Sequence, residues 1–461
     1  MTYNQGMHDP FSKKVKVLKE AEFLISQTKV DLKMHESLAF DRLSSLIKYA
    51  SSNSDFWRDR LKSAAYGSAD ELKFLLKEIP ITTSRELQLI GEKMRILPPN
   101  IARLNYRIFR TSGTTSQPKE VMKLASFHGL LVSSIVVFEW LWHKRDVSLQ
   151  VAAFRVNRPD NDKAPKNLAL TYIGNPSHPV IRESTHRTAP QLLDELEKIQ
   201  PHYLYTNGLM LRLMATEQLR KPRHIKHLKE VWSVSDLIES TTRSLINEAF
   251  GVRVIDRYST EEFGVIALQC PVDDHLHVIA PRFVVEVLDE DGVEVEIGKP
   301  GRAIITSLTG KVQPLLRYEI GDILVLGSNC RGGYTWPIIE KILGRNRQTF
   351  KTKEGEEKFV TLVGSPLLEI REILDFKLII FTDSFVMVIN CLDSIDSNMN
   401  KRVTDAIHDT FKEKRTVRIL RSSDPKMFKN WKRKEFEIID TALKKNLEDA
   451  ELHEYLLQFA V

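Results

Sequence analysis

The sequence predicts an α/β protein in which a large N-terminal domain of mixed sheets and helices precedes a small C-terminal α+β domain. Three observations support this fold class. From about residue 101, helix-like and strand-like segments alternate along the chain, which favours an α/β sheet. Alternating strands flank Asp291 and Gly292, a dipeptide that strongly favours a hairpin turn. After Gly344, strand, strand, helix and strand follow one another.

The length of the chain indicates more than one domain. It has 461 residues, whereas single hydrophobic cores stop growing at roughly 250–300 residues. We place a large domain at residues 1–343, with a helical part at about 1–100 and the main binding site at 101–343. The small domain then covers residues 344–461, a size within the usual range for domains.

Helices are expected first. Residues 36–50 place Leu38, Leu43, Leu46 and Ile47 near helical spacing. The helical region ends near a stretch punctuated by proline, LKEIPITTSREL.

Helix and strand signals then alternate through the middle of the chain. Thr188 is a suitable N-cap for a helix with Pro190 in its first turn, and an apolar stretch follows that helix. A second helix stops at Gly251, and the strand VRVID comes directly after it. In the last part, FKLIIFTDSFVMVIN predicts two strands, KRVTDAIHDTFKEK a helix and TVRIL a strand.

Composition excludes several classes of protein. The chain is 42% hydrophobic and 28% charged, without an apolar run near the roughly 20 residues of a membrane span and without a signal peptide at its start. Its net charge of +6 is mild and dispersed, so we expect no nucleic-acid partner. Three cysteines are too few for a disulfide framework. We therefore expect a cytoplasmic protein with no membrane contact.

The stretch RTSGTTSQPKEV, residues 110–121, carries the strongest functional signal. Backbone N–H groups of a tight loop can converge on an anion, and hydroxyls and a lysine add further donors. The alternative is a polar surface turn. Gly113 allows close approach of the backbone. The candidate polyphosphate donors are Thr111, Ser112, Thr114, Thr115 and Lys119.

This loop resembles the phosphate loop of the adenylate-forming enzymes, the superfamily of acyl-CoA synthetases, peptide-synthetase adenylation domains and luciferases. The sequence departs from the usual pattern at Ser116, where glycine is usual. Nearly the whole chain is most similar to the phenylacetate-CoA ligase and capsule-biosynthesis branch. The resemblance implies that residues 111–115 and Lys119 hold the phosphates of ATP.

Further motifs follow in the order of that family. DRYSTEEFG is similar to the Tyr-Gly-x-x-Glu element, which implies that Tyr258 stacks on adenine and Glu262 holds Mg²⁺, with Glu261 as the competing metal ligand. RYEIGD resembles the element whose aspartate, here Asp322, binds both ribose hydroxyls.

Other family positions match less closely. LGRN resembles the hinge between the two domains, and Arg345 is the expected contact to ribose or phosphate. Ser235 and Asp236 occupy the place of an element beside adenine. The small domain of the family carries a catalytic lysine that neutralises charge on the α-phosphate. Lys432 is the best match within NWKRKEF, and the other candidates are Lys429 and Lys434.

The resemblance implies an ATP-dependent acid–thiol ligase. A small carboxylic acid would form an acyl- or aryl-adenylate and pyrophosphate, and the acyl group would pass to the thiol of CoA or of a carrier-protein phosphopantetheine. Aromatic, amino-aromatic and short acyl acids all remain open. Trp140, Trp142 and Phe154 either line an aryl slot or pack a helix on the sheet.

Two alternative functions stay open. The enzyme could stop at the adenylate and pass the acyl group to an amine or a protein. The chain could also be a non-catalytic nucleotide-binding scaffold. This hypothesis is supported by the positions at which the sequence departs from the family pattern, which are Ser116, Ser259, Arg347 and Trp431.

A candidate zinc site involves two of the three cysteines. Some relatives in this branch have a cysteine–histidine set that looks metal-binding, and Cys270, Cys330 and either His275 or His277 correspond to it. A structural Zn²⁺ normally has four protein ligands. No second cysteine follows Cys330, so a fourth ligand is missing and we expect plain thiols rather than zinc.

Overall fold

The structure is a computed structural model in which the chain forms two compact units. It describes residues 10–66, 71–97, 105–111, 119–155, 159–163, 172–174, 179–184, 186–233, 238, 240–345, 349–391, 394–422, 436–438 and 454. The first unit comprises residues 1–207, 224–235 and 254–342, and the second comprises 208–223, 236–253 and 343–461. Helices combine with parallel and antiparallel sheets, which confirms the predicted α/β class.

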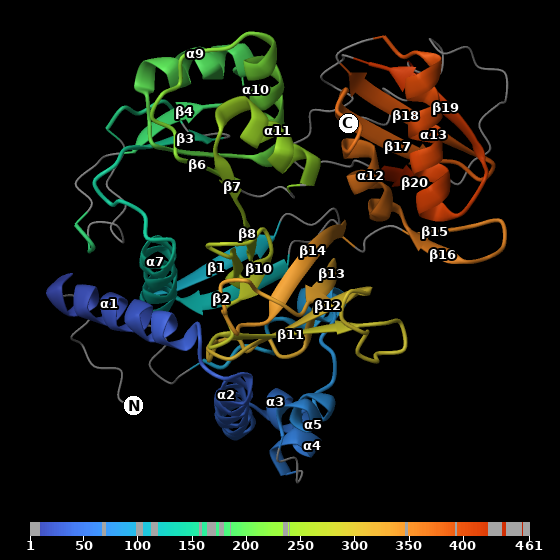
Figure 1. Cartoon of the computed structure of the whole chain (residues 1–461). Helices are drawn as coiled ribbons and strands as arrows, with labels where there is room; N and C mark the ends of the chain where they lie inside the picture. The colour runs from blue at the N-terminus through green and yellow to red at the C-terminus, as the bar shows by residue number, and fades with distance from the viewer. Residues whose placement is uncertain are drawn as a thin grey trace. The chain divides into compact units, whose positions relative to one another are not determined.

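Helices open the first unit, as the leucine spacing predicts. They are α1 (Pro10–Gln27), α2 (Leu32–Asn53), α3 (Asp55–Arg60), α4 (Lys62–Tyr66), α5 (Leu72–Lys77) and α6 (Ser84–Ile90). Leu43, Leu46 and Ile47 of α2 are buried, and α3, α4 and α5 all pack against this helix (Figure 1). Thr83 caps α6 in a reciprocal capping box with Glu86.

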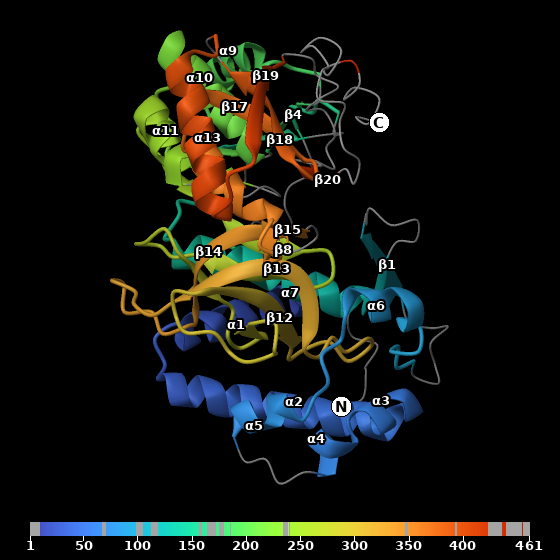
Figure 2. The same cartoon turned by 90° about the vertical axis from the view of Figure 1, so that its right-hand side faces the viewer.

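A seven-stranded sheet forms the centre of the first unit. Its order is β11-β12-β13-β14-β10-β9-β8. The strands are β8 (Arg257–Thr260), β9 (Gly264–Gln269), β10 (Leu276–Val278), β11 (Phe283–Leu288), β12 (Pro300–Ser307), β13 (Tyr318–Gly327) and β14 (Ile338–Arg345). Figure 2 shows the strong curvature of β12 and β13.

The predicted hairpin is present, although its second strand begins later than the turn suggests. β11 and β12 are antiparallel, with Phe283 opposite Ser307. Asp289 and Val293 close a turn in which Gly292 has a φ of 80°. Only an isolated bridge, Leu288 to Glu294, follows before Pro300.

Helix α7 (Ala125–Trp142) packs against β2, β9 and α1. In the described part of the chain it is the one helix that is long and apolar enough to cross a membrane by length and composition alone, and 39% of its residues are buried. The expectation that no apolar run approaches such a length is therefore corrected for this helix. Its packing explains the apolar side chains that face the core, among them Val137 and Phe138.

A five-stranded sheet of order β4-β3-β5-β6-β7 completes the first unit, and the pairs β3–β4, β3–β5 and β5–β6 are parallel. The strands are β3 (Val151–Arg155), β4 (Val180–Glu183), β5 (Tyr203–Thr206), β6 (Glu230–Ser233) and β7 (Arg253–Ile255). Helix α9 (Ala189–Ile199) begins at Thr188 with a capping box and a proline in its first turn, as predicted.

The second unit contains the predicted order of strand, strand, helix and strand. These elements are β17 (Ile373–Ile380), β18 (Ser384–Cys391), α13 (Ser397–Phe411) and β19 (Thr416–Arg421). β20 (Phe436–Ile438) adds a parallel strand beside β17. The smaller elements are the hairpin β15 (Thr349–Lys351) and β16 (Glu357–Phe359), the 3₁₀ turn at Val360–Val363 and α12 (Gly364–Leu368).

Two helices from the middle of the chain belong to this unit. They are α10 (Gly208–Arg220) and α11 (Ser240–Phe250), and Gly251 with a φ of 66° follows α11 as predicted. The buried Arg212 guanidinium donates to the carbonyl of Ile373 at 2.8 Å and to the hydroxyl of Thr242 at 3.0 Å. The domain boundary predicted at Gly344 stays a prediction.

Candidate active site

The strands β1 (Tyr106–Thr111) and β2 (Lys119–Leu124) hold the ends of the predicted phosphate loop together. They are antiparallel, and Thr111 lies opposite Lys119. The loop itself, with Ser112, Gly113, Thr114 and Thr115, lies outside the described residues, as does the side chain of Thr111. The antiparallel pair β1–β2 therefore fixes the positions of the two residues at which the loop begins and ends.

Lys119 and Glu262 meet in a buried polar cluster. The Lys119 ammonium lies 3.0 Å from Oε1 of Glu262, and the exposed fractions of the two side chains are 9% and 6%. It also donates to Oγ of Ser84 at 2.8 Å and to the hydroxyl of Tyr318 at 3.1 Å. All three ammonium protons therefore have an acceptor. The cluster joins α6, β2, the turn after β8 and β13.

Tyr258 and Asp322 form a second buried pair. The Tyr258 hydroxyl donates to Oδ2 of Asp322 at 2.6 Å. Tyr258 comes from β8 and Asp322 from β13, which also carries Tyr318 four residues earlier. The structure thus links residues from the two motifs that the sequence analysis assigned to one nucleotide.

Glu261 and Glu262 are placed differently, although they are adjacent in sequence. Glu262 is buried beside Lys119, whereas Glu261 is exposed. One carboxylate that faces a buried cation is suited to a hard metal ion that shares its remaining ligands with phosphates. Glu262 therefore fits Mg²⁺ better than Glu261 does.

Lys123 is a residue that the sequence analysis missed. Its ammonium donates to the backbone carbonyl of Glu261 at 3.1 Å and lies 4.7 Å from the centre of the Phe109 ring. Burial lowers the pKa of Lys123 to about 8, although the carboxylates of Glu261 and Glu262 act in the opposite direction. The available signal was the period of two along β2, which places Lys119 and Lys123 on one face.

Several predicted site residues lie outside the described parts of the chain. Arg345 ends β14, but nothing of its side chain is described, and Gly344 before it has a φ of 103°. The other predicted site residues outside the described ranges are Ser235, Asp236, Lys429, Lys432 and Lys434.

The tryptophans considered for an aryl slot are packed in the core. Trp140 meets Trp232 edge to face, with ring centres 5.7 Å apart. Trp142 stacks on Phe138 at 5.2 Å and also packs against Trp336. These contacts favour the packing explanation over a substrate slot.

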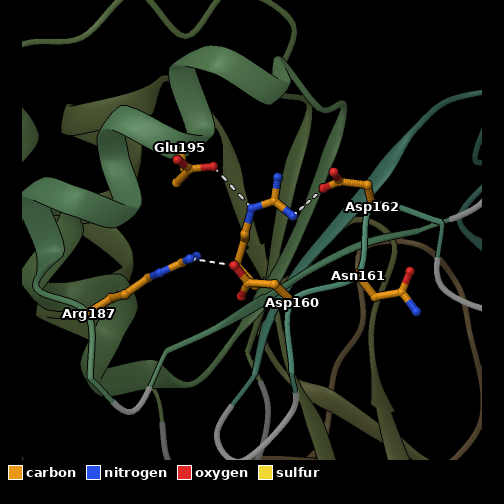
Figure 3. Close-up of a pocket in the computed structure, with 6 residues that line it drawn as sticks. Asp160, Asn161, Asp162, Arg187 and Glu195 are labelled. Carbon is orange, nitrogen blue, oxygen red and sulfur yellow. Dashed lines mark hydrogen bonds and ion pairs between the residues drawn. The ribbon is translucent and has the colours of Figure 1, made fainter.

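A polar pocket of about 220 Å³ lies apart from these clusters and contains none of the predicted site residues. Arg182 of β4 lies 2.5 Å from Asp162 and 3.0 Å from Glu195. Arg187 pairs with Asp160 at 2.5 Å, as Figure 3 shows. Since both arginines already have carboxylate partners, the pocket offers no unbalanced cation to an anionic ligand.

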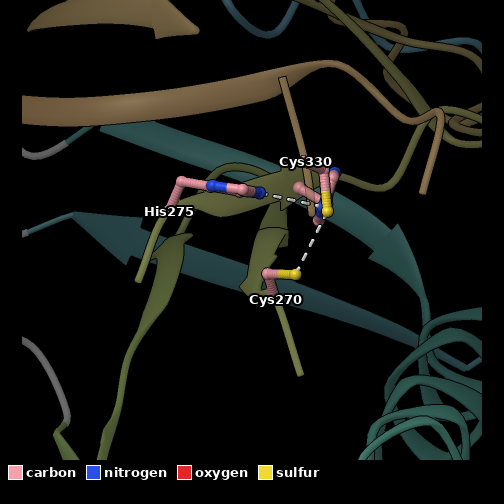
Figure 4. Close-up of side chains that lie close together, drawn as sticks. Cys270, His275 and Cys330 are labelled. Atoms are coloured by element: carbon pink, nitrogen blue, oxygen red, sulfur yellow. Dashed lines mark hydrogen bonds between the residues drawn. The ribbon is translucent and has the colours of Figure 1, made fainter. Parts of the chain in front are cut away.

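The cysteine–histidine set is more complete than the sequence suggested. Ligand atoms of Cys270, His275, His277 and Cys330 all lie within 4.8 Å of one another. The prediction that a fourth ligand is missing is therefore wrong, because both histidines take part. His275 and His277 flank Leu276 of β10, and both bring Nε2 to the cluster, 3.2 Å apart. Figure 4 shows Cys270 and Cys330 side by side, with a sulfur–sulfur distance of 3.5 Å.

The chain has the fold of solved acyl-CoA ligases, as the sequence resemblance predicted. Over 94% of both chains, it is similar to 2-hydroxyisobutyryl-CoA ligase in the postadenylation state in complex with 2-HIB-AMP, with a TM-score of 0.70 and 15% identity. A second similar structure is the anthranilate CoA ligase AuaEII in complex with anthranoyl-AMP. Its TM-score is 0.51 at 16% identity, over 69% of this chain and 63% of that one.

One curated protein resembles part of the sequence. The phenylacetate-coenzyme A ligase of Thermus thermophilus is 31% identical over 137 residues, which are 29% of this chain and 31% of that ligase. The matched segment thus spans about a third of the length of that relative. No protein-family model matches the chain.

Proposed function

We propose that this protein is an adenylate-forming acid–thiol ligase. It would join a small carboxylic acid to the AMP part of ATP, release pyrophosphate, and then pass the acyl group to the thiol of CoA or of a carrier-protein phosphopantetheine. The observation that carries the proposal is the pair of buried contacts Lys119–Glu262 and Tyr258–Asp322 on this fold. These contacts bring together four residues from three separate motifs that the family resemblance assigns to the binding of one nucleotide.

The first contact would serve the phosphates. Bound Mg²⁺ supplies charge neutralisation between phosphate oxygens, and Glu262 would hold it. Lys119 would then turn its charge from the carboxylate towards the phosphates, while Ser84 and Tyr318 keep the ammonium oriented. Electrostatic stabilisation of this kind often supplies the largest part of a rate enhancement.

The second contact would serve the nucleoside. The Asp322 carboxylate can accept hydrogen bonds from two neighbouring hydroxyls, as ribose offers them. The hydrogen bond from Tyr258 holds one carboxylate oxygen in place and fixes the tyrosine ring at the same time. A ring fixed in this way is suited to stacking against adenine.

The remaining roles rest on the family resemblance. We assign phosphate binding to residues 111–115, the adenine side to Ser235 and Asp236, and a ribose or phosphate contact to Arg345. We assign charge neutralisation in the adenylation step to Lys432, or else to Lys429 or Lys434. The hinge would lie near Gly344, where a φ of 103° suits glycine.

The similar proteins indicate classes of acid and of acceptor. The similar structures hold 2-HIB-AMP and anthranoyl-AMP, so both aliphatic and aromatic acids suit this fold. The partial match to a phenylacetate-coenzyme A ligase supports an aryl acid and CoA. We place the reaction in the cytoplasm, in keeping with three free cysteines.

Exchange of radiolabelled pyrophosphate into ATP, measured across a panel of carboxylic acids, tests the proposal. Exchange that depends on one class of acid is expected. No exchange with any acid, despite binding of ATP, would instead support a nucleotide-binding scaffold. Product analysis with CoA, a holo carrier protein or amines then identifies the acceptor.

We expect kcat/KM for ATP to fall as the pH rises through about 8, because Lys123 loses its proton there. The free enzyme determines this ratio, so its pH profile reports the pKa of the unliganded lysine. Lys123→Arg should keep the charge and remove the fall, since the guanidinium stays protonated. Lys198→Arg, on the exposed face of α9, should leave the profile unchanged. A fall near pH 8 that persists in Lys123→Arg would assign it to another group.

A further inference from the structure

The cysteine–histidine cluster of the first unit is outside the proposed reaction. It contains Cys270 after β9, His275 and His277 around β10, and Cys330 in the connection from β13 to β14. These residues come from three separate segments, yet their ligand atoms converge within 4.8 Å. We propose that these four side chains bind one zinc ion in a closed, structural Cys₂His₂ site, with His277 as the ligand that completes it.

The distance between the two sulfurs and the distance between the two nitrogens fit a tetrahedral ion. With Zn–S at about 2.3 Å and Zn–N at about 2.0–2.1 Å, a tetrahedron separates its two sulfurs by about 3.8 Å and its two nitrogens by about 3.3 Å. The observed separations are 3.5 Å between the sulfurs of Cys270 and Cys330 and 3.2 Å between the Nε2 atoms of His275 and His277. Two thiolates and two imidazoles are also a ligand set that zinc prefers.

The second histidine is oriented for this role. Nδ1 of His277 lies 2.9 Å from the carbonyl oxygen of Trp336, to which it donates its proton. That contact leaves the lone pair on Nε2, the atom that faces the cluster. A backbone carbonyl that fixes the tautomer in this way is a usual partner of a histidine bound to a metal.

Backbone N–H groups support both sulfurs. Those of Val272 and Asp273 donate to the sulfur of Cys270, and that of Gly332 lies 3.3 Å from the sulfur of Cys330. The turn at Gly332 has no room for a side chain, because an added Cβ would lie 2.6 Å from a ring carbon of Tyr334 and 2.8 Å from a methyl carbon of Val272.

Bound zinc would restrain the connection from β13 to β14, which has little regular structure. The segment from Ser328 to Pro337 contains no helix or strand. It is held elsewhere by Trp336, whose indole donates to the carbonyl of Gln27 at 3.0 Å, and by Arg331, which pairs with Asp273 at 2.5 Å. Zinc would add a link from this segment to β9 and β10, and its binding energy would contribute to the stability of the sheet.

Metal analysis of the full chain tests the inference, which is independent of the proposed reaction. Protein purified without chelators or metal-affinity resin should contain about one zinc per chain. Cys330→Ser and His277→Asn should lower the zinc content at least about tenfold. Cys391→Ser, which changes the buried cysteine of the second unit, should keep the zinc. Cobalt(II) in place of zinc should give the strong visible bands of tetrahedral thiolate coordination.

Stability gives a second readout. Removal of the metal from the wild-type protein should lower the melting temperature of the first unit by about 5 °C or more. Wild-type protein without stoichiometric zinc after growth in zinc-supplemented medium would overturn the inference, as would an octahedral cobalt spectrum or a Cys270–Cys330 disulfide. If the variants fail to fold, the zinc content and cobalt spectrum of the wild type decide the question alone.

Discussion

Glu262→Gln lowers acid-dependent exchange of pyrophosphate into ATP by about a hundredfold to a thousandfold, the range expected when one preorganised electrostatic group is lost from a catalytic site. The amide keeps the shape of the side chain but has no negative charge. That charge pairs with Lys119 in the structure and would hold Mg²⁺ when the nucleotide binds. The concentration of Mg²⁺ needed for half-maximal exchange should also rise. Initial exchange rates over a Mg²⁺ titration give both quantities.

Glu261→Gln is the matched control, because Glu261 is adjacent in sequence but exposed. It should keep an exchange rate close to that of the wild type. Glu262→Gln also breaks the buried ion pair with Lys119 and should cost about 3–5 kcal/mol of stability. Folding is checked by thermal unfolding. If Glu261→Gln were the more damaging change, the metal ligand would be Glu261.

Glu139→Gln should lower the free energy of unfolding of the first unit by about 3–5 kcal/mol, the usual cost of breaking a buried ion pair. The Glu139 carboxylate is 1% exposed and lies 2.5 Å from Arg257 and 3.3 Å from Arg145. Burial raises its pKa, but the two guanidiniums together hold the pKa below its usual value. Its contribution is therefore complete above the unfolded pKa and is lost as the pH falls through the folded pKa.

Denaturant unfolding followed by tryptophan fluorescence measures this effect. Trp232 reports on the site directly, because the Arg145 guanidinium lies 4.7 Å from its ring centre. Glu294→Gln is the control, since Glu294 forms an exposed pair with Lys73 at 3.5 Å and should change stability by at most about 1 kcal/mol. Equal effects of the two substitutions would show that the ion pairs of Glu139 with Arg257 and Arg145 contribute no more than an exposed pair does.

Sequence patterns located elements whose signals are local. The capping residue Thr188, the glycine stop at Gly251 and the period of α2 depend on neighbouring residues, and the structure confirms each. The start of β12 at Pro300 could not be read in this way, because the turn chemistry near Gly292 does not set how far the following chain runs before it pairs.

Contacts between residues that are far apart in sequence could not be predicted from local patterns. Tyr258 and Asp322 were assigned to one nucleotide by family resemblance alone, and their hydrogen bond depends on how the seven-stranded sheet is folded. The fourth member of the cysteine–histidine cluster had a local signal, since two histidines separated by one residue in a strand face the same side. Which partners they meet depends on β10 lying between β9 and β14. Arg212 bonds across 161 positions to Ile373, and no local pattern indicates this.

The contact between Lys119 and Glu262 has a consequence for the choice of ligand in the proposed reaction. A polyanion without a bound cation can attract the Lys119 ammonium only if Glu262 is left as an unpaired buried carboxylate. A polyanion that carries a divalent ion offers each member of the pair a new partner in the same event. The Lys119–Glu262 pair would therefore weaken the binding of uncomplexed triphosphates, free pyrophosphate and simple anions. It would favour the binding of a nucleotide that is complexed with a divalent ion.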